Sequence, residues 1–440
     1  MTKDSVAIAI EALSWMAYQG LSERAALLKA ADEVNVNDSS AMREAHRQVM
    51  ETSRFQNKLE NLITQVIPEN EFAQTPHGIR SLLMLVTFSK FVDHARDREL
   101  ERLMHFAREI LGWKELKPYE ESIACLAKGK LSLNLDHLTE SERLAIETCH
   151  PNWYVARLMS TFDRATALRI LQRDLHPLPT FVRVNTLRTT NEDTIVTALN
   201  GQRVEGVKNA LKITGKSRPE ARRELLASGQ IVVQDLASSL TALVASPRPG
   251  QKVLDVCAAP GNKTTHLAAE MQNDGQIYSI EFSTTRIPQW KREVERTGCS
   301  IAQIVRSDAR ALPVEGRFDL VLVDPPCSNT GVFARNPDAK WGTNYGKVRD
   351  LSARQEAILQ SSSRHVDDGG CLVYCTCSIL PEENEFVLET FLKKNPEFSL
   401  VPQGPFIGSP GLRGFESCQR LYPHLHECNG YFIAKMRRKV

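Results

Sequence analysis

The chain has 440 residues, a formal net charge of +2 and 42% hydrophobic residues. This composition is typical of a globular protein with two or three domains, and it excludes a disordered or fibrous chain. No apolar run approaches the ~20 residues that a membrane span needs. Asp4 and Glu11 lie where a signal peptide would have a basic start and an apolar run. We therefore expect a cytoplasmic protein with no membrane partner.

The ten cysteines do not form a metal-binding pattern. None are spaced C-x-x-C, and the spacing of Cys371, Cys375 and Cys377 on a predicted strand suits no structural zinc site. Most of them are expected to be reduced and buried. The sequence therefore predicts neither a metal nor a disulfide framework.

Charge is distributed unevenly along the chain. Residues 1–150 are net acidic, whereas residues 151–248 are net basic. A local basic segment is typical of a partner that is a polyanion, although an ordinary solvated surface can give the same excess. The candidates for phosphate contacts are Arg183, Arg188, Arg222 and Arg223.

In chain order, residues 1–145 have the spacing of helices, as in Val6, Ile10, Leu13 and Ala17. From Phe181 the pattern is mixed and rich in Gly and charge. After the Pro-Gly pair at 249–250, short apolar strands alternate with amphipathic helical segments. We therefore predict a helical domain over 1–145, a small basic module over 146–235 and an α/β domain over 236–440.

The α/β domain is predicted to contain a parallel sheet covered by helices on both faces. The expected strands are 253–257, 277–281, 301–305, 318–324 and 371–375, and the expected helices are 264–271, 284–297 and 351–366. Ligands of such sheets bind at the carboxyl ends of the strands. The residues that follow each strand are therefore the candidates for chemistry.

A turn between the first strand and its helix is a candidate nucleotide-cofactor site. It is neither a Walker A loop nor a G-x-G-x-x-G motif. Its small residues let the backbone approach a ligand closely, and the helix start supplies free N–H groups. The residues of this turn are Cys257, Ala258, Ala259, Pro260, Gly261, Asn262 and Lys263.

Acidic residues follow three further strands. Glu281 ends the second strand, where a carboxylate can accept hydrogen bonds from ribose hydroxyls. Asp308 follows the third strand, in position for a base edge, and Asp324 ends the fourth. Surface carboxylates are common, so the indication comes from their occurrence at successive strand ends.

Two cysteines follow neighbouring strands beside this turn. Cys327 lies after the fourth strand and Cys377 after the fifth. Either one alone could be a small buried hydrophobe. Both together, after turn-forming residues, favour covalent catalysis by a thiolate, which divides one difficult step into two easier ones.

Six stretches carry a resemblance to a known family: FVRVNTL (181–187), VQDLASS (233–239), VLDVCAAPGNKT (253–264), VDPPCSNTG (323–331), CTCSILPEEN (375–384) and YPHLHECNGYFIAKM (422–436). The sequence resembles the Nol/Nop/Sun family of RNA cytosine-5 methyltransferases, and within it the Sun/Fmu-type ribosomal RNA enzymes. The resemblance covers roughly residue 151 onward. It implies a Rossmann-like S-adenosylmethionine (SAM)-dependent methyltransferase domain, a preceding RNA-binding module and a NusB-like helical domain.

The resemblance also implies roles for the candidate residues. SAM would be held by residues 257–263 with Glu281, Asp308 and Asp324. Cys377 would be the nucleophile that adds to carbon 6 of cytosine, and Cys327 would assist product release. Asp324 is the candidate that supplies a proton near ring nitrogen N3. Asn262 departs from the family's usual glycine, and Glu281 stands where Asp is commoner; both changes are tolerable, because Asn accepts positive φ and the longer Glu side chain reaches the ribose.

The implied function is methylation of carbon 5 of a cytosine in structured RNA, first 16S-type small-subunit ribosomal RNA and next transfer RNA, by a monomer. A DNA cytosine-5 methyltransferase would not need Cys377, and an amino-group methyltransferase would have an aromatic residue in place of Cys327. A non-catalytic RNA-binding assembly factor is the alternative from another class, and the intact cysteines and carboxylates argue against it.

Overall fold

The computed structural model of the chain describes residues 1–214 and 219–440. These residues divide into two compact units. Unit 1 comprises Met1–Leu175 together with Asn336–Asn344, and unit 2 comprises His176–Arg335 together with Tyr345–Val440. Each unit has its own hydrophobic core, so each can be described separately.

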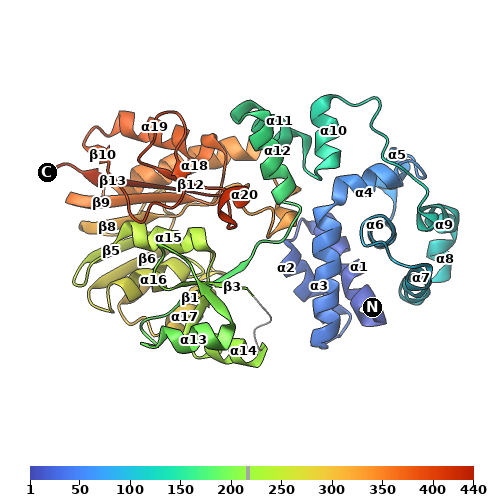
Figure 1. Cartoon of the computed structure of the whole chain (residues 1–440), viewed down its shortest axis with the longest axis horizontal. Coiled ribbons are helices and arrows are strands. Elements are labelled where there is room, and N and C mark those ends of the chain that lie inside the picture. Colours follow the sequence, from blue (N-terminus) through green and yellow to red (C-terminus); the bar gives the residue numbers. More distant parts are fainter. Residues whose placement is uncertain (215–218) are drawn as a thin grey trace. The chain divides into compact units, whose positions relative to one another are not determined.

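Unit 1 is helical, as predicted (Figure 1). Its helices are α1 (Lys3–Gln19), α2 (Glu23–Glu33), α3 (Ser39–Arg54), α4 (Gln56–Ile63), α5 (Glu69–Gln74), α6 (His77–Phe91), α7 (Asp97–Leu111), α8 (Trp113–Leu116), η1 (Lys117–Tyr119), α9 (Glu120–Lys128), α10 (Glu140–Glu147), α11 (Asn152–Thr161), α12 (Arg164–Arg173) and η2 (Pro337–Lys340). Local signals set several starts: the Asp38 side chain accepts from two main-chain N–H groups at the start of α3. Because α11 and α12 pack into this unit, it extends to Leu175, beyond the boundary expected at residue 145.

A short segment from the middle of the sequence completes unit 1. Lys340, in residues 336–344, is fully buried, and its Nζ donates to the main-chain oxygens of Arg54 (3.2 Å) and Cys149 (2.9 Å). Trp341 donates its indole N–H to the oxygen of Ser53 at 2.7 Å. Burial lowers the pKa of Lys340 to about 8, against the opposing effect of the buried Asp174 carboxyl. A cation held in this way ties the segment to the helices around it.

A small four-stranded antiparallel sheet opens unit 2. Its strands are β1 (Thr180–Val184), β2 (Gly201–Arg203), β3 (Ala210–Ile213) and β4 (Ile231–Val233), in the order β2-β3-β1-β4, with helices α13 (Glu192–Leu199) and α14 (Pro219–Ala227). We call residues 176–235 the β-module. It covers the later part of the basic module that was expected over 146–235, because residues 146–175 belong to unit 1.

Strand β1 is buried on both faces, which corrects one expectation from the sequence. Val182 and Val184 pack into the core of the β-module, whereas Phe181 packs into the core of the large sheet. Arg183 shares the face of Phe181 because side chains alternate along a strand. It is only 1% exposed, so the expectation that it contacts phosphate is wrong.

The large sheet has nine strands. They are β5 (Lys252–Val256), β6 (Gln276–Glu281), β7 (Ala302–Arg306), β8 (Phe318–Val323), β9 (Val366–Thr376), β10 (Phe398–Leu400), β11 (Ser409–Pro410), β12 (Gln419–Leu421) and β13 (Tyr431–Arg438). Their order is β11-β12-β13-β9-β8-β5-β6-β7, with β10 beside β13. Strands β5 to β9 are parallel, as predicted, and β13 pairs antiparallel with β9.

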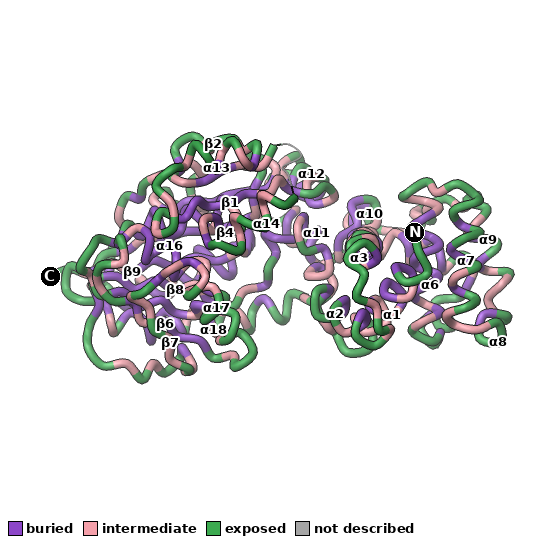
Figure 2. The backbone as a smooth tube through the Cα atoms, turned by 90° about the horizontal axis from the view of Figure 1, so that it is seen from below, coloured by how far each residue is buried: buried purple, intermediate pink, exposed green. Residues whose placement is uncertain are grey.

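Helices cover both faces of this sheet, and its central strands β5, β8 and β9 are mostly buried, whereas the edge strand β7 is not (Figure 2). The helices are α15 (Leu236–Ala245), α16 (Asn262–Glu270), α17 (Ile287–Thr297), α18 (Tyr345–Ser363), α19 (Glu385–Lys394) and α20 (Pro423–His426), with η3 (Pro381–Glu383). Residues of α15 and α16 share one core with one face of β8 and β9, and residues of α18 and α19 share another core with the opposite face. This is the Rossmann-like arrangement that the sequence predicted.

The position of the site follows from strand order. From β5 the chain adds β6 and β7 on one side and then β8 and β9 on the other, so the direction in which strands are added reverses at β5. In open α/β sheets, ligands bind in the crevice at the carboxyl ends of the strands at such a reversal. The residues after β5 and β8 should therefore form the site.

Replacing Lys340 by Met should destabilise unit 1 by about 3 kcal/mol. Two main-chain carbonyl groups and the Asp174 carboxyl would lose a buried cation. The measurement is differential scanning calorimetry of the whole chain, in which the transition of unit 1 should move to lower temperature. Lys130→Ala, at an exposed lysine, is the matched control and should leave it in place; equal shifts in both variants would contradict the role of Lys340.

Candidate active site

The carboxyl ends of β5 and β8 lie side by side. Strand β8 pairs with β5 through Val323 and Val256, and the Asp324 N–H donates to the oxygen of Val256 at 3.2 Å. Strand β9 lies on the other side of β8 and leads to Cys377. Residues that are far apart in sequence, Cys257, Asp324 and Cys377, are therefore brought to one edge of the sheet.

The turn after β5 depends on backbone conformation as much as on small side chains. Cys257 has φ of 65° and Gly261 has φ of 109°, and helix α16 begins immediately after Gly261. A Cβ on Gly261 would lie 3.3 Å from Trp290 Cδ1. The glycine is thus required by its own φ and by the indole packed against it.

Glu281, at the end of β6, holds this turn. Its Oε2 accepts from the Ala259 N–H at 3.2 Å and its Oε1 from the Ser283 N–H at 2.9 Å. Glu281 is 5% exposed, and the Arg286 guanidinium also lies beside it, with Nη1 3.6 Å from Oε2. A carboxylate has about four acceptor positions, so it retains acceptor capacity for ribose hydroxyls.

A cavity of about 170 Å³ opens beside the turn. It brings together Cys257, Glu281 and Asp308, three of the residues predicted from the sequence. Asp308 is paired with Arg310, Nη2 to Oδ2 at 2.6 Å, and hydrogen bonds from Arg310 lower the pKa of Asp308 to about 2. Apolar Phe282, Ala309 and Pro326 form part of the wall, together with polar residues that include Arg286 and Arg354. Acceptors beside apolar side chains suit an adenosine, with ribose at the carboxylates and the base against the apolar wall.

Two side chains of the turn point away from the backbone loop toward other elements. The Lys263 Nζ lies 2.6 Å from Asp324 Oδ2, and Asn262 Nδ2 donates to the oxygen of Val233 at 3.4 Å. Burial works against the charge of Lys263, but Asp324 and the nearby Cys375 and Cys377 together raise its pKa. Lys263 therefore remains a cation and links the turn to Asp324.

The thiols of Cys327 and Cys377 face each other. Their Sγ atoms are 2.9 Å apart, and Cys377 Sγ lies 3.0 Å from Asn329 Oδ1. The hydrogen bond with Cys377 and burial raise the pKa of Cys327 well above its ordinary value. Cys327 therefore keeps its proton.

A buried polar network fixes the two cysteine loops. Glu383 Oε1 accepts from the Ser328 N–H at 2.8 Å and from Gln355 Nε2 at 2.9 Å, and Oε2 accepts from the Ser328 hydroxyl. Thr330 and Ser378 hydroxyls lie 2.8 Å apart and join the loop after β8 to the loop after β9. Glu383 is fully buried, so its role is to hold the loop that carries Cys327.

Sequence reasoning did not assign roles to Glu383, Ser328, Asn329 or the buried Asp255. All four lie inside the stretches that carried the family resemblance, which is the signal that could have found them. Asp255 accepts from the Thr264 hydroxyl at 2.5 Å, and burial raises its pKa to about 6. Thr264 in turn accepts from the Trp290 indole N–H at 3.0 Å. Asp255 therefore supports the start of α16 through its hydrogen bond with Thr264.

Within residues 1–214 and 219–440, no group of three or more His, Cys, Asp or Glu side chains could hold a metal ion. Over the same residues, the helices include none with the length and apolar character of a transmembrane span.

Comparison with known proteins agrees with this geometry. The parallel strand order, the turn after β5 and the acidic residues after β6 and β7 define the class of SAM-dependent methyltransferases. The family profile described as 16S rRNA methyltransferase RsmB/F matches residues 242–437. The chain is 33% identical over 312 residues to a probable ribosomal RNA small subunit methyltransferase B of Bacillus subtilis, covering 68% of each chain. The chain therefore belongs to the RsmB/F methyltransferase family, which confirms the resemblance to Nol/Nop/Sun enzymes.

Longer relatives and solved structures are also similar. A 28S rRNA (cytosine-C(5))-methyltransferase of Mus musculus is 32% identical over 314 residues, but the match covers only 40% of that protein. The chain thus spans less than half the length of this relative. The crystal structure of the protein PH0851 matches all of this chain and 99% of its own, with a TM-score of 0.85 and 26% identity. A methyltransferase homolog from Pyrococcus horikoshii matches 68% of this chain and 100% of its own, with a TM-score of 0.60 and 30% identity.

Gly261→Val should weaken SAM binding at least tenfold, which is about 1.4 kcal/mol. Valine disfavours φ near 109°, and its Cβ would press on Trp290. Isothermal titration calorimetry gives the affinity. Gly250→Val is the matched control, because Gly250 also has positive φ, at 83°, but precedes β5 and has open space around it. If the affinity of Gly261→Val equals that of the parent chain, the turn is not part of the cofactor site.

Proposed function

We propose that the chain transfers a methyl group from SAM to carbon 5 of a cytosine in RNA, and that its substrate is 16S-type small-subunit ribosomal RNA. The observation that carries this proposal is the pair of facing thiols, Cys327 and Cys377, beside Asp324 at the ends of adjacent parallel strands. The family profile and the relative from Bacillus subtilis support ribosomal RNA as the substrate.

A thiolate is needed because carbon 5 of cytosine is a weak nucleophile. When the Cys377 thiolate forms a bond to carbon 6, the ring electrons move toward N3 and carbon 5 becomes enamine-like. SAM supplies an electrophilic methyl group to that carbon. Asp324 is the group proposed to hold the proton at N3, and the Lys263 ammonium at 2.6 Å can replace that proton.

Release of the product reverses the addition. The proton on carbon 5 leaves to a base, its bonding electrons re-form the ring double bond, and the bond from carbon 6 to Cys377 Sγ breaks with its electron pair remaining on sulfur. Cys327, whose pKa is raised by its hydrogen bond with Cys377 and by burial, has a thiol proton to donate to the departing sulfur 2.9 Å away. We therefore assign the nucleophile to Cys377 and product release to Cys327.

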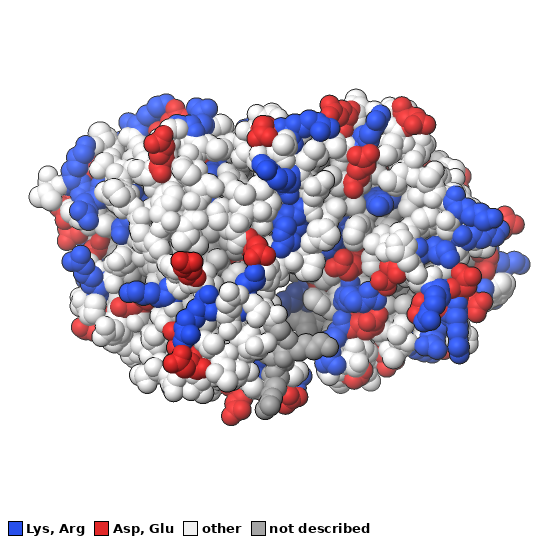
Figure 3. Space-filling view, in the orientation of Figure 1, with Lys and Arg blue, Asp and Glu red and all other residues white. Residues whose placement is uncertain are grey.

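The β-module is proposed to bind RNA. Of its basic candidates, Arg188 and Arg223 are exposed and Arg222 is half-buried. On the face drawn in Figure 3, Lys and Arg side chains are interspersed with Asp and Glu. Charge alone therefore does not outline the RNA path, and the salt dependence of binding is the informative measurement.

Transfer RNA is the second candidate substrate. A tRNA (cytosine(72)-C(5))-methyltransferase of Pyrococcus horikoshii is 37% identical over 212 residues, which are 48% of this chain. Methylation of purified 16S ribosomal RNA and of transfer RNA, followed by bisulfite sequencing, separates the two substrates. A NusB-like character for unit 1, a monomeric state and a cytoplasmic location stay predictions from the sequence.

Replacing Cys327 by Ala should trap a covalent protein–RNA complex, whereas replacing Cys377 by Ala should abolish both adduct and turnover. Without Cys327 the enzyme can still add to the base and methylate it, but elimination stalls. The stalled complex is a slow band on a denaturing gel. The double variant should give no band. The opposite pattern, with the adduct trapped by Cys377→Ala, would assign the nucleophile to Cys327.

A triple change of Arg188, Arg222 and Arg223 to Ala should weaken RNA binding and lower the slope of log K against log salt concentration by about 2–3. Filter binding at several salt concentrations measures this slope, and SAM affinity should not change. The charge-matched control replaces Lys393, Lys394 and Arg413, which lie on or near α19, by Ala. A slope unchanged by the first triple variant would show that these arginines do not contact phosphate.

A further inference from the structure

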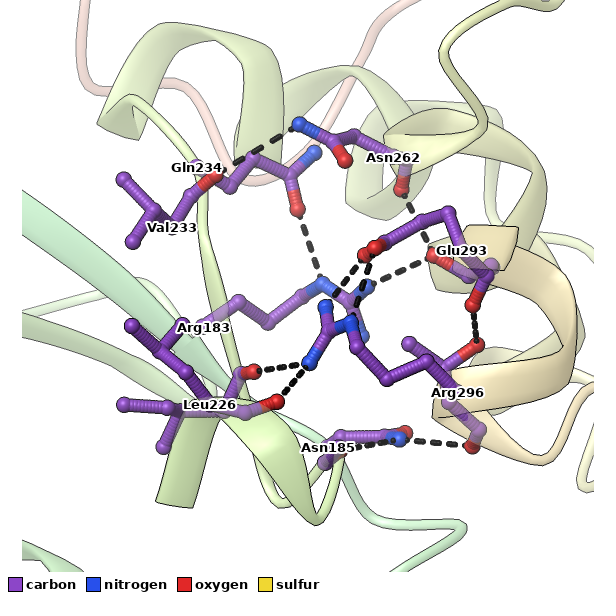
Figure 4. A network of polar contacts seen from close by, with 12 residues as sticks. Arg183, Asn185, Leu226, Val233, Gln234, Asn262, Glu293 and Arg296 are labelled. Carbon is purple, nitrogen blue, oxygen red and sulfur yellow. Dashed lines mark hydrogen bonds and ion pairs between the residues drawn. The ribbon is translucent and has the colours of Figure 1, made fainter. Parts of the chain in front are cut away.

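Arg183 is buried at the junction of the β-module and the large sheet. It lies on β1, is 1% exposed, and points toward the start of α16 (Figure 4). Its Nε donates to Gln234 Oε1 at 2.8 Å, and its Nη2 donates to Thr265 Oγ1 at 3.1 Å. The proposed chemistry does not use this guanidinium, although burying a charge without a direct ion pair is costly.

One of these contacts reaches the cofactor turn. Thr265 lies in the first turn of α16, and its hydroxyl donates to the main-chain oxygen of Asn262 at 3.2 Å. Lys263, which follows Asn262 in the sequence, carries the ammonium that pairs with Asp324. The Arg183 guanidinium is therefore two hydrogen bonds from the backbone of the turn and close to the residues that set the position of Asp324.

The other contacts hold the same turn from the end of β4. Gln234, which accepts from Arg183, follows Val233, and the oxygen of Val233 accepts from Asn262 Nδ2 at 3.4 Å. Asn262 occupies the position where the family has a glycine, which has no side chain to make this contact. Arg183 and Asn262 thus fix the turn to β1 and β4 of the β-module.

Separate side chains attach the β-module to α17 without touching α16. Asn185 Nδ2 donates to the oxygens of Gly229 and Thr297, both at 2.8 Å. Arg296 Nη1 donates to the oxygens of Leu226 and Ile231, the latter at 3.1 Å. General attachment of the β-module therefore does not require Arg183, and the structure offers a control for it.

We propose that Arg183 is a positioning residue for SAM: from the β-module, it holds the first turn of α16 so that residues 257–263 keep the conformation that binds the cofactor. This role rests on the proposed function, and it replaces the phosphate contact expected from the sequence. Arginine suits the position because its planar fork presents several donors in fixed directions, here toward Gln234 and Thr265. A lysine ammonium has no such fork and cannot reproduce the separate directions of the Nε and Nη2 donors.

The test compares Arg183→Met, Arg183→Lys and the control Asn185→Ala in the whole chain. Calorimetric titration with SAM should give an affinity at least tenfold weaker for Arg183→Met and an intermediate affinity for Arg183→Lys. Asn185→Ala should lower the melting temperature, yet keep the affinity within threefold of the parent chain. In steady-state methylation, Arg183→Met should raise KM for SAM at least tenfold and change kcat less than threefold.

Three outcomes would overturn the proposal. Unchanged SAM affinity in Arg183→Met would show that the turn keeps its conformation without the guanidinium. Equal losses in Arg183→Met and Asn185→Ala would show that attachment of the whole β-module, and not this contact, sets the affinity. No SAM binding by the parent chain would overturn the proposed function together with this inference, whereas the first two outcomes leave the proposed function intact.

Discussion

Parallel pairing of β8 with β5 on one side and with β9 on the other is the constraint on which the site depends. It sets the ends of three strands at one edge, so the cofactor turn, Asp324 and Cys377 need no long loops to meet. The register matters as much as the order. Val323 pairs with both Val256 and Tyr374, so a shift of one residue would turn Asp324 away from Lys263.

Close approach of the two cysteine loops requires buried polar groups. Gly331 lies so near Gly430 that a Cβ would be 2.0 Å from the Gly430 oxygen, and the Gly331 N–H donates to the oxygen of Cys377 at 2.9 Å. Glu383 satisfies donors of the loop that would otherwise be buried without partners. A fully satisfied network of this kind is rigid, which suits two thiols that must keep a fixed separation while a base enters and leaves.

The large sheet could be predicted because its central parallel strands, such as β5 and β8, are buried and give short apolar runs between turn signals. The C-terminal strands could not be predicted in this way. Strand β12 contains the buried polar residues Gln419 and Arg420, whose partners, such as Glu385, come from other parts of the sequence. Spacing alone also could not separate α11 and α12 from the β-module.

At the site, cysteines and acidic residues at strand ends were predictable because strand topology fixes where they meet. The groups that support these residues could not be predicted, because the sequence does not distinguish a buried glutamate such as Glu383 from a surface glutamate. Arg183 was also misplaced, because a buried side chain was predicted to lie at the surface. A count of basic residues suggested a surface contact, whereas alternation on β1 turns its side chain into the protein.

The closure of unit 1 by residues 336–344 has a consequence for how the chain is made. A ribosome releases the helices up to Leu175 first, but the buried Lys340 and the half-buried Trp341 follow only after most of the parallel sheet has been synthesised. At typical elongation rates this delay is on the order of 10 to 30 s. During that interval the nascent helices expose the carbonyl groups and apolar surface that this segment later covers, which is the surface a chaperone would bind. For the same reason, a fragment cut at Leu175 would lack the contacts that Lys340 and Trp341 make with the main chain of this unit.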